Sequence, residues 1–130
     1  MEIDRIDHFV LTVHDINETC KLYSRVFGMQ VVTFEGGRRA LLFGNQKINL
    51  HEAGKELEPK ALNPTAGSGD VCFITRIPLE HVIDRIRSCG VEIVDGPVRR
   101  TGAVGPIESI YVRDPDGNLI EIANYLKKEA

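Results

Sequence analysis

The chain has 130 residues, of which 42% are hydrophobic and 27% charged, and its formal net charge is −3. Length and composition are those of an ordinary globular protein, and we expect one domain over residues 1–130. The acidic balance and the lack of a basic run exclude the charge pattern of a nucleic-acid-binding protein, and no apolar stretch approaches the ~20 residues of a membrane span.

The first half of the chain predicts a βαβββ module over residues 4–52. Residues 6–13 alternate as a strand does, with Phe9, Leu11 and Val13 on one face. Asp15 and Glu18 form a capping-box pattern at the start of a helix that we expect to end at Gly28. Three further strands are predicted at 29–34, 39–43 and 47–52.

The second half predicts the same module over residues 69–126, after a polar, Gly- and Pro-containing connection at 53–68. Its expected elements are a strand at 69–75, a helix from Pro78 to Gly90, a strand at 91–94, and a hairpin of 108–113 and 118–124. Segment 27–29 precedes segment 89–91 by 62 residues, and the same offset places His8 on Asp70. The sequence therefore predicts an α+β fold of two βαβββ modules that form a half-barrel-like sheet around a central cavity.

The period-two pattern also predicts which side chains face that cavity. Where apolar residues of the outer strands face the helices, the polar residues between them face the opposite side. The polar residues in question are His8, Asn49, His51, Asp70 and Glu121. A solvated sheet face would explain any one of them, but apolar neighbours such as Val10 and Ile74 favour a half-enclosed cavity. Carboxylates and imidazoles gathered there suit a divalent cation, namely zinc, nickel, iron, manganese or cobalt.

Two longer segments support a family resemblance. Ile-Asp-His-Phe-Val-Leu-Thr-Val at 6–13 and Asp-Pro-Asp-Gly-Asn-Leu-Ile-Glu-Ile at 114–122 resemble the vicinal-oxygen-chelate superfamily of glyoxalases, bleomycin-resistance proteins and dioxygenases. Segments 46–52, 58–60 and 100–102 are similar to the short glyoxalase-domain-containing protein of animals and its virulence-associated bacterial relatives.

The resemblance implies four metal positions, one from the first and one from the last strand of each half. On this chain they fall on His8, on Asn49 or His51, on Asp70 and on Glu121. Glyoxalases usually carry Glu or Gln at the second position and His at the third. Internal symmetry gives Asn49 for the second position, whereas His51, on the same face, is the better ligand, so both stay open.

The first hypothesis is a metal-dependent lyase, isomerase or dioxygenase acting on a small molecule with adjacent oxygens, with Glu121 as ligand and proton shuttle. Arg100, in an expected loop at 99–106, and Asn49 are candidate substrate-binding residues, although a mobile surface loop explains Arg100 equally well. The alternative is a metal-free sequestering protein of the bleomycin-resistance type, which the small number of aromatic residues disfavours.

We expect a homodimer located in the cytoplasm. The resemblance implies a homodimer, and the connection at 53–68 is long enough for a domain-swapped arrangement in which each cavity is built from two chains. Three cysteines without CxxC spacing, Cys20, Cys72 and Cys89, favour reduced thiols in a cytoplasmic protein over a disulfide framework.

Overall fold

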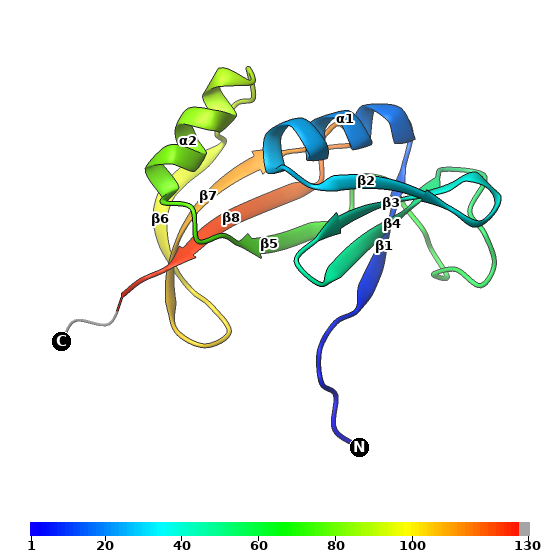
Figure 1. Cartoon of the computed structure of the whole chain (residues 1–130), viewed down its shortest axis with the longest axis horizontal. Coiled ribbons are helices and arrows are strands. Elements are labelled where there is room, and N and C mark those ends of the chain that lie inside the picture. The colour runs from blue at the N-terminus through cyan, green and yellow to red at the C-terminus, as the bar shows by residue number, and fades with distance from the viewer. Residues whose placement is uncertain (128–130) are drawn as a thin grey trace. The chain divides into compact units, whose positions relative to one another are not determined.

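The computed structural model describes residues 1–127. Its internal contacts divide the chain into two units, one ending at Ser68 and the other beginning at Gly69. Each unit carries one four-stranded sheet and one α-helix, as Figure 1 shows.

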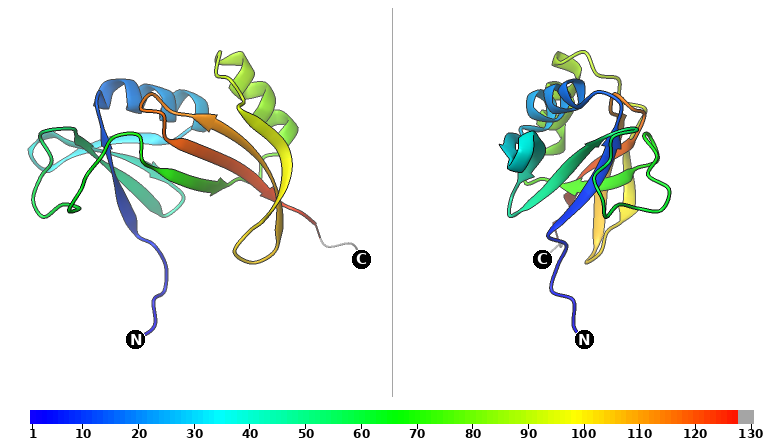
Figure 2. Two further views of the ribbon diagram at one scale, coloured as in Figure 1. Left: turned by 180° about the vertical axis from the view of Figure 1, so that it is seen from behind. Right: turned by 90° about the vertical axis from the view of Figure 1, so that its right-hand side faces the viewer.

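The first unit contains β1 (His8–Val13), α1 (Ile16–Phe27), β2 (Gln30–Phe34), a short 3-10 helix (Glu35–Gly37), β3 (Arg38–Phe43) and β4 (Gln46–Glu52). The strand order is β1-β4-β3-β2, with β1 parallel to β4 and the other pairs antiparallel. Helix α1 contacts β2, β3 and β4 and covers one face of this sheet, while the connection 53–68 loops out beside it (Figure 2).

The predicted ends of α1 are confirmed. The Asp15 carboxylate accepts a hydrogen bond from the backbone N–H of Glu18 at 3.2 Å. At the other end Gly28 has φ +69°, a left-handed conformation that a residue with a Cβ rarely adopts. Inside these caps, Thr19, Cys20 and Tyr23 are buried toward the sheet, so the opposite face of β1 and β4 remains for the cavity.

The second unit contains β5 (Asp70–Ile74), α2 (Leu79–Ser88), β6 (Asp95–Thr101), β7 (Pro106–Arg113) and β8 (Leu119–Tyr125). Its strand order, β5-β8-β7-β6, repeats that of the first unit, again with a parallel outer pair. Both sheets are open, with β1 and β2 as edges of the first and β5 and β6 as edges of the second. Neither sheet is closed into a barrel.

The predicted strand at 91–94 and the predicted loop at 99–106 are wrong in their boundaries. The strand is β6, which begins at Asp95, and Arg99 and Arg100 lie on it, paired with Glu108 and Ile107 of β7. The Gly-Pro step at residues 96 and 97 disturbs the register of this strand and hides its alternation in the sequence. Arg100 therefore stands on a strand of the sheet rather than in a mobile loop.

A buried turn before β8 fixes the two strands that carry Asp70 and Glu121. The Asp114 carboxylate accepts hydrogen bonds from the backbone N–H groups of Asp116 and Asn118 and from the Asn118 side-chain amide, at 2.8 to 2.9 Å. The side-chain oxygen Oδ1 of Asn118 in turn accepts from the Gly69 N–H at 2.7 Å. Because Gly69 directly precedes β5, Asn118 ties the start of β5 to the start of β8.

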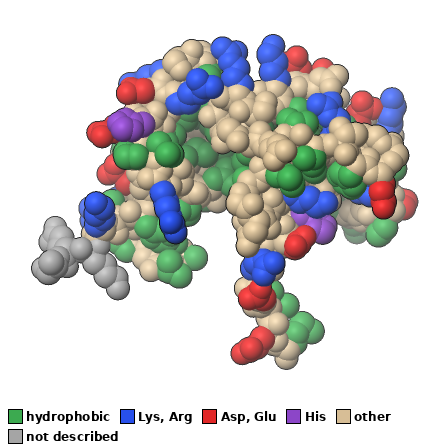
Figure 3. Space-filling model, in the orientation of Figure 1, with side chains coloured by type: hydrophobic (Ala, Val, Ile, Leu, Met, Phe, Trp, Pro, Cys, Tyr) green, Lys and Arg blue, Asp and Glu red, His purple; other side chains and the backbone are tan. Residues whose placement is uncertain are grey.

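The surface carries charges of both signs. On the face drawn in Figure 3, basic and acidic side chains are interspersed with apolar ones. None of the helices in the described part of the chain has the length and apolar character needed to cross a bilayer.

Candidate functional site

The first unit has a cavity of about 400 Å³ on the sheet face that α1 leaves open. Strands β1, β3 and β4 and the connection that follows β4 supply its lining, which consists of His8, Val10, Arg38, Asn49, His51, Leu57, Glu58 and Pro59. Both candidates for the second metal position, Asn49 and His51, therefore line the same cavity as His8.

The side-chain oxygen of Asn49 is buried without a partner. Asn49 is only 6% exposed, and its Oδ1 atom has no hydrogen-bond partner among the described residues. A buried amide oxygen left in this way costs free energy unless a ligand satisfies it. Amide oxygens are weak but accepted ligands for hard divalent ions, so this oxygen is available to a bound cation or to a donor group on a substrate.

His51 lies beside Asn49 and is 7% exposed. Its burial, and then the positive charge of Arg38, lower the pKa of the imidazole, while Glu56 acts in the opposite direction. His51 is therefore neutral near pH 7, which is the form that binds a metal ion.

His8 is oriented by its neighbour in sequence. Its Nδ1 atom lies 2.7 Å from Oδ2 of Asp7, and this hydrogen bond is the largest cause that lowers the pKa of Asp7. The contact favours a proton on Nδ1 and leaves the lone pair of Nε2 for a ligand, as carboxylate–histidine pairs do beside metal ions.

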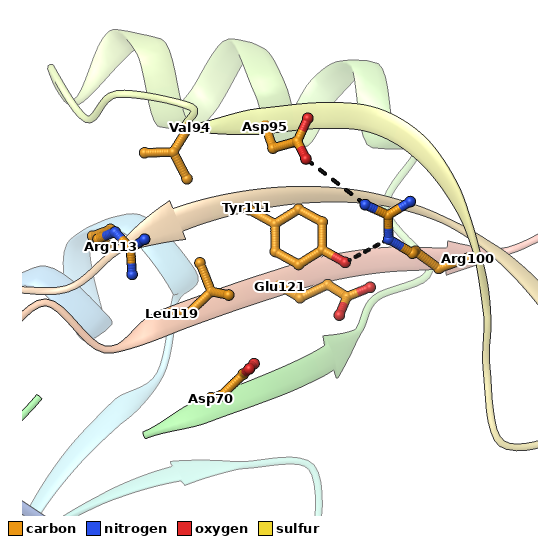
Figure 4. Close-up of a pocket in the computed structure, with 8 residues that line it drawn as sticks. All are labelled: Asp70, Val94, Asp95, Arg100, Tyr111, Arg113, Leu119 and Glu121. Carbon is orange, nitrogen blue, oxygen red and sulfur yellow. Dashed lines mark hydrogen bonds and ion pairs between the residues drawn. The ribbon is translucent and has the colours of Figure 1, made fainter. Parts of the chain in front are cut away.

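The second unit has its own cavity, of about 470 Å³, on the open face of its sheet. Its lining residues are drawn in Figure 4 and are Asp70, Val94, Asp95, Arg100, Tyr111, Arg113, Leu119 and Glu121. The predicted residues Asp70 and Glu121 thus line one cavity, and the predicted substrate-binding residue Arg100 lines it with them.

One oxygen of the Glu121 carboxylate is held by a neighbour on the same face of the sheet. The hydroxyl of Ser109, which is fully buried, donates to Oε2 of Glu121 at 2.5 Å. This hydrogen bond fixes one oxygen of a carboxylate that lines the cavity. Packing around the Cys72 sulfur, together with the charge and a hydrogen bond of Glu121, raises the pKa of that thiol to about 11, so Cys72 stays protonated beside the carboxylate.

Arg100 and Tyr111 form a linked pair across β6 and β7. The Nε–H group of Arg100 donates to the Tyr111 hydroxyl at 3.0 Å, and the guanidinium carbon lies 5.6 Å from the ring centroid. Burial raises the pKa of Tyr111, and Arg100 opposes this effect through its hydrogen bond and charge. In the ladder Tyr111 stands directly opposite Glu121, so both side chains project from the same face of the sheet.

The register shows that the two cavities are built on one plan. His8 pairs with Lys47, and Asn49 stands two residues beyond that partner. Asp70 pairs with Leu119, and Glu121 likewise stands two residues beyond. Asn49 is therefore the counterpart of Glu121, and His51 is the counterpart of Ala123.

Each cavity offers two of the predicted ligand positions, and within residues 1–127 no three His, Cys, Asp or Glu side chains gather closely enough to hold a metal ion. Sequence reasoning missed several lining residues, among them Arg38, Leu57, Asp95 and Tyr111. The position of Tyr111 could have been predicted, because in a hairpin closed by the turn at 114–117 Tyr111 pairs with Glu121. The position of Leu57 could not, because it lies in the connection after β4, where no strand pairing or periodicity applies.

Comparison with known proteins shows a family match over most of the chain. Residues 5–122 match the model of the Glyoxalase/Bleomycin resistance protein/Dioxygenase superfamily. Virulence protein STM3117 of Salmonella typhimurium is 59% identical over 126 residues, which are 97% of this chain and 88% of that protein. Its crystal structure superposes with a TM-score of 0.96, covering 97% of this chain and all of that one (100%). Glyoxalase domain-containing protein RDO1 of Mycosarcoma maydis is 53% identical, covering 96% of this chain and 70% of that protein.

More distant structures share the fold alone. The fosfomycin resistance protein FosX of Listeria monocytogenes, solved with Mn(II) and a sulfate ion, is 23% identical with a TM-score of 0.68, covering 96% of this chain and 93% of that one. TnmS3, an antibiotic binding protein of a Streptomyces species, is 18% identical with a TM-score of 0.77, covering 97% of this chain and 99% of that one. The fold thus occurs in a protein crystallised with a metal ion and in a protein described as an antibiotic binder.

Proposed function

We propose, on the premise that the chain belongs to the Glyoxalase/Bleomycin resistance protein/Dioxygenase superfamily, that this protein is a divalent-metal-dependent enzyme. Its substrate would be a small molecule with adjacent oxygens, and the reaction would be of the lyase, isomerase or dioxygenase type. The observation that carries the proposal is the matching register of the two pairs, His8 with Asn49 and Asp70 with Glu121.

The residues present fit a divalent ion chemically. The first unit supplies a neutral imidazole at His51, an oriented imidazole at His8 and the unpartnered Asn49 oxygen. The second unit supplies the carboxylates of Asp70 and Glu121. Zinc, nickel, iron, manganese and cobalt all accept such a nitrogen and oxygen set. A bound ion would act as a Lewis acid toward the adjacent oxygens of the substrate.

In this proposal the side chains of the protein bind the substrate and move a proton. Glu121 is the catalytic residue, because its carboxylate lines the cavity while Ser109 holds Oε2. Asn49 offers its buried oxygen to a hydroxyl group of the substrate when it does not bind the ion. His8, His51, Asp70 and Glu121 are the proposed metal ligands, with Asn49 as the alternative to His51.

Metal uptake tests the proposal directly. Protein refolded with each of the five divalent ions is dialysed and analysed for bound metal. We expect one ion per chain for at least one metal, loss of uptake in Glu121→Ala, and retained uptake in Glu108→Ala, which removes an exposed carboxylate of β7 outside the lining of the cavity. If no metal is taken up in stoichiometric amount, the proposal is wrong.

The four proposed ligands can belong to one chain or to two chains of a swapped homodimer. Mixing and refolding the variants His8→Ala and Glu121→Ala distinguishes these arrangements. In a swapped dimer, random pairing restores about a quarter of the sites, because each mixed dimer joins one intact first unit to one intact second unit. If each site lies within one chain, mixing restores none.

The second candidate is a metal-free binding protein. Apolar residues in the first cavity, Val10, Leu57 and Pro59, favour an apolar ligand, and the Arg38 charge beside His51 disfavours a cation there. A thermal-shift screen of metals beside small apolar ligands distinguishes the two candidates, because only the true ligand class raises the melting temperature. In either case we propose a cytoplasmic location, in keeping with the free thiols of Cys20, Cys72 and Cys89.

A further inference from the structure

The cavity of the second unit is lined by both carboxylate and guanidinium groups. Figure 4 shows the Arg100 guanidinium and the Tyr111 hydroxyl at one end of the cavity, near the Glu121 carboxylate. The proposed metal chemistry uses Glu121 and Asp70 and gives the Arg100–Tyr111 pair no role.

The contacts of Arg100 orient its guanidinium but leave N–H groups available to a ligand. Nε–H donates to Tyr111 at 3.0 Å and Nη1 donates to the carbonyl oxygen of Arg99 at 3.2 Å. Nη2 lies 3.7 Å from Oδ2 of Asp95, which is longer than a normal hydrogen bond. Both side chains of that ion pair are about half exposed, so the pair is weak and an anion in the cavity can replace it at small cost.

Tyr111 links the guanidinium to Glu121. Its oxygen accepts the hydrogen bond from Arg100, and a side-chain hydrogen bond with Glu121, which together with burial raises the pKa of Tyr111, directs its own proton toward that carboxylate. Its ring stands opposite Glu121 in the ladder. The phenol thus holds the guanidinium in place, and a guanidinium fork suits two oxygens of one anionic group.

Charge balance decides when an anion can bind there. The cavity is lined by three carboxylates, Asp70, Asp95 and Glu121, and by two guanidinium groups, Arg100 and Arg113, which gives −3 + 2 = −1. A divalent cation changes this to +1. The same cavity therefore disfavours an anion when it lacks metal and favours one when metal is bound.

We propose that Arg100 and Tyr111 form the recognition site for an anionic oxygen group of the substrate, a carboxylate or a phosphonate, a few bonds from the oxygens that bind the metal. This deepens the proposed function and rests on it for the identity of the bound molecule as a substrate. The substrate class becomes small acids with an adjacent hydroxyl or carbonyl oxygen.

The experiment uses three probes that share one hydroxyl group and differ in charge: glycolate, hydroxymethylphosphonate and uncharged glycolamide. Binding to the full chain is followed through the Nε–H resonance of Arg100 in ¹H–¹⁵N spectra, with and without zinc, at constant ionic strength. We expect saturable shifts with at least one anion, about tenfold tighter binding with zinc, and no shift of this resonance with glycolamide. The tighter of the two anions identifies the group.

Variants assign the effect to the site and are followed by calorimetry. Arg100→Gln should weaken binding of the anion about ten- to a hundredfold and leave glycolamide binding unchanged, and Tyr111→Phe should weaken anion binding about tenfold. Arg99→Gln is the matched control, because Arg99 lies on the same strand outside the lining of the cavity, and it should retain full affinity.

Two results would overturn the inference. One is the lack of any saturable shift of the Arg100 resonance, with zinc or without it. The other is an equal loss of anion affinity in Arg99→Gln and Arg100→Gln, which would mean that general surface charge binds the anion. If zinc uptake fails while anions still move the Arg100 resonance in the metal-free protein, the proposed function falls and the anion site stands.

Discussion

Asn49 holds in the first sheet the ladder position that Glu121 holds in the second. His8 pairs with Lys47, and Asn49 lies two residues after that partner. Asp70 pairs with Leu119, and Glu121 lies two residues after it in the same way. The carboxylate of Glu121 is hydrogen-bonded by Ser109, whereas the Asn49 oxygen is buried without a partner. The repeat therefore has a hydrogen-bonded carboxylate at this position in the second sheet and an amide oxygen without a partner in the first.

Restoring the charge at the neutral position should strengthen metal binding. Asn49→Glu places a carboxylate where the buried oxygen now lies, and we expect metal affinity to rise by about tenfold or more, because a charged oxygen is a stronger ligand than an amide. Equilibrium dialysis measures the change. Gln30→Glu, on the exposed part of β2, makes the same change in net charge outside the cavity and should have no effect. Equal affinity of Asn49→Glu and the natural protein would contradict the proposed role of this position.

The hydrogen bond from Ser109 to Glu121 should affect metal affinity more than the free energy of unfolding. Ser109→Ala removes the hydroxyl that donates to Oε2, and we expect metal affinity to fall about tenfold or more while the free energy of unfolding falls by about 1 kcal/mol. Calorimetric titration and urea unfolding measure the two effects. Ser88→Ala, which removes a hydroxyl bonded to a carbonyl of α2, should leave metal affinity unchanged. A loss of stability without loss of affinity would show that Ser109 is structural only.

The periodicity of the sequence was sufficient to predict that His8, Asn49, His51, Asp70 and Glu121 face a cavity, because alternation fixes the face of a strand. It did not predict that the first three line one cavity and the last two another. The caps of α1 were predictable for a similar reason, since Asp15 and Gly28 act within one turn of the helix. Both predictions depend on local geometry.

The remaining lining residues depend on nonlocal geometry. Leu57 and Pro59 reach the first cavity through the path of the connection, which no periodicity describes. Arg100 was predicted in a loop because the Gly-Pro step masks the start of β6, and only pairing with β7 reveals the strand. The link between Arg100 and Tyr111 likewise needs the register of two strands that are separated by a turn.

The turn that positions β8 should be a major source of stability in the second unit. Asn118 is 1% exposed, and its side chain bonds both Asp114 and the Gly69 N–H. Asn118→Ala leaves the part-buried Gly69 N–H without its acceptor and the buried Asp114 carboxylate without a donor, and we expect a loss of about 2–4 kcal/mol in the free energy of unfolding. Urea denaturation measures it, with Asn63→Ala in the exposed connection as control. A loss below about 1 kcal/mol would show that water replaces the side chain.

The lowered pKa of His51 predicts how stability depends on pH. The folded protein keeps this imidazole neutral below its ordinary value of 6.5, where the unfolded chain binds a proton. The contribution is fully present above about pH 6.5 and is lost as the pH falls toward the folded value. We expect His51→Gln to flatten the slope of the unfolding free energy in the range just below pH 6.5, and His81→Gln, an exposed control, to leave it unchanged. An unchanged slope in His51→Gln would contradict this assignment.

The thiol of Cys72 should react slowly even though the residue is exposed. Its pKa is raised from 9.0 to about 11, first by burial of the sulfur and then by Glu121, so near pH 8 the thiolate fraction is about a hundredfold below that of an ordinary cysteine. Alkylation by iodoacetamide, followed on the Cys72 peptide by mass spectrometry, should be slow in the folded protein and fast in denaturant. Glu121→Gln should accelerate it in the folded metal-free protein, because the repelling charge is gone. If that variant reacts no faster, the two side chains are not coupled, and burial alone protects the thiol.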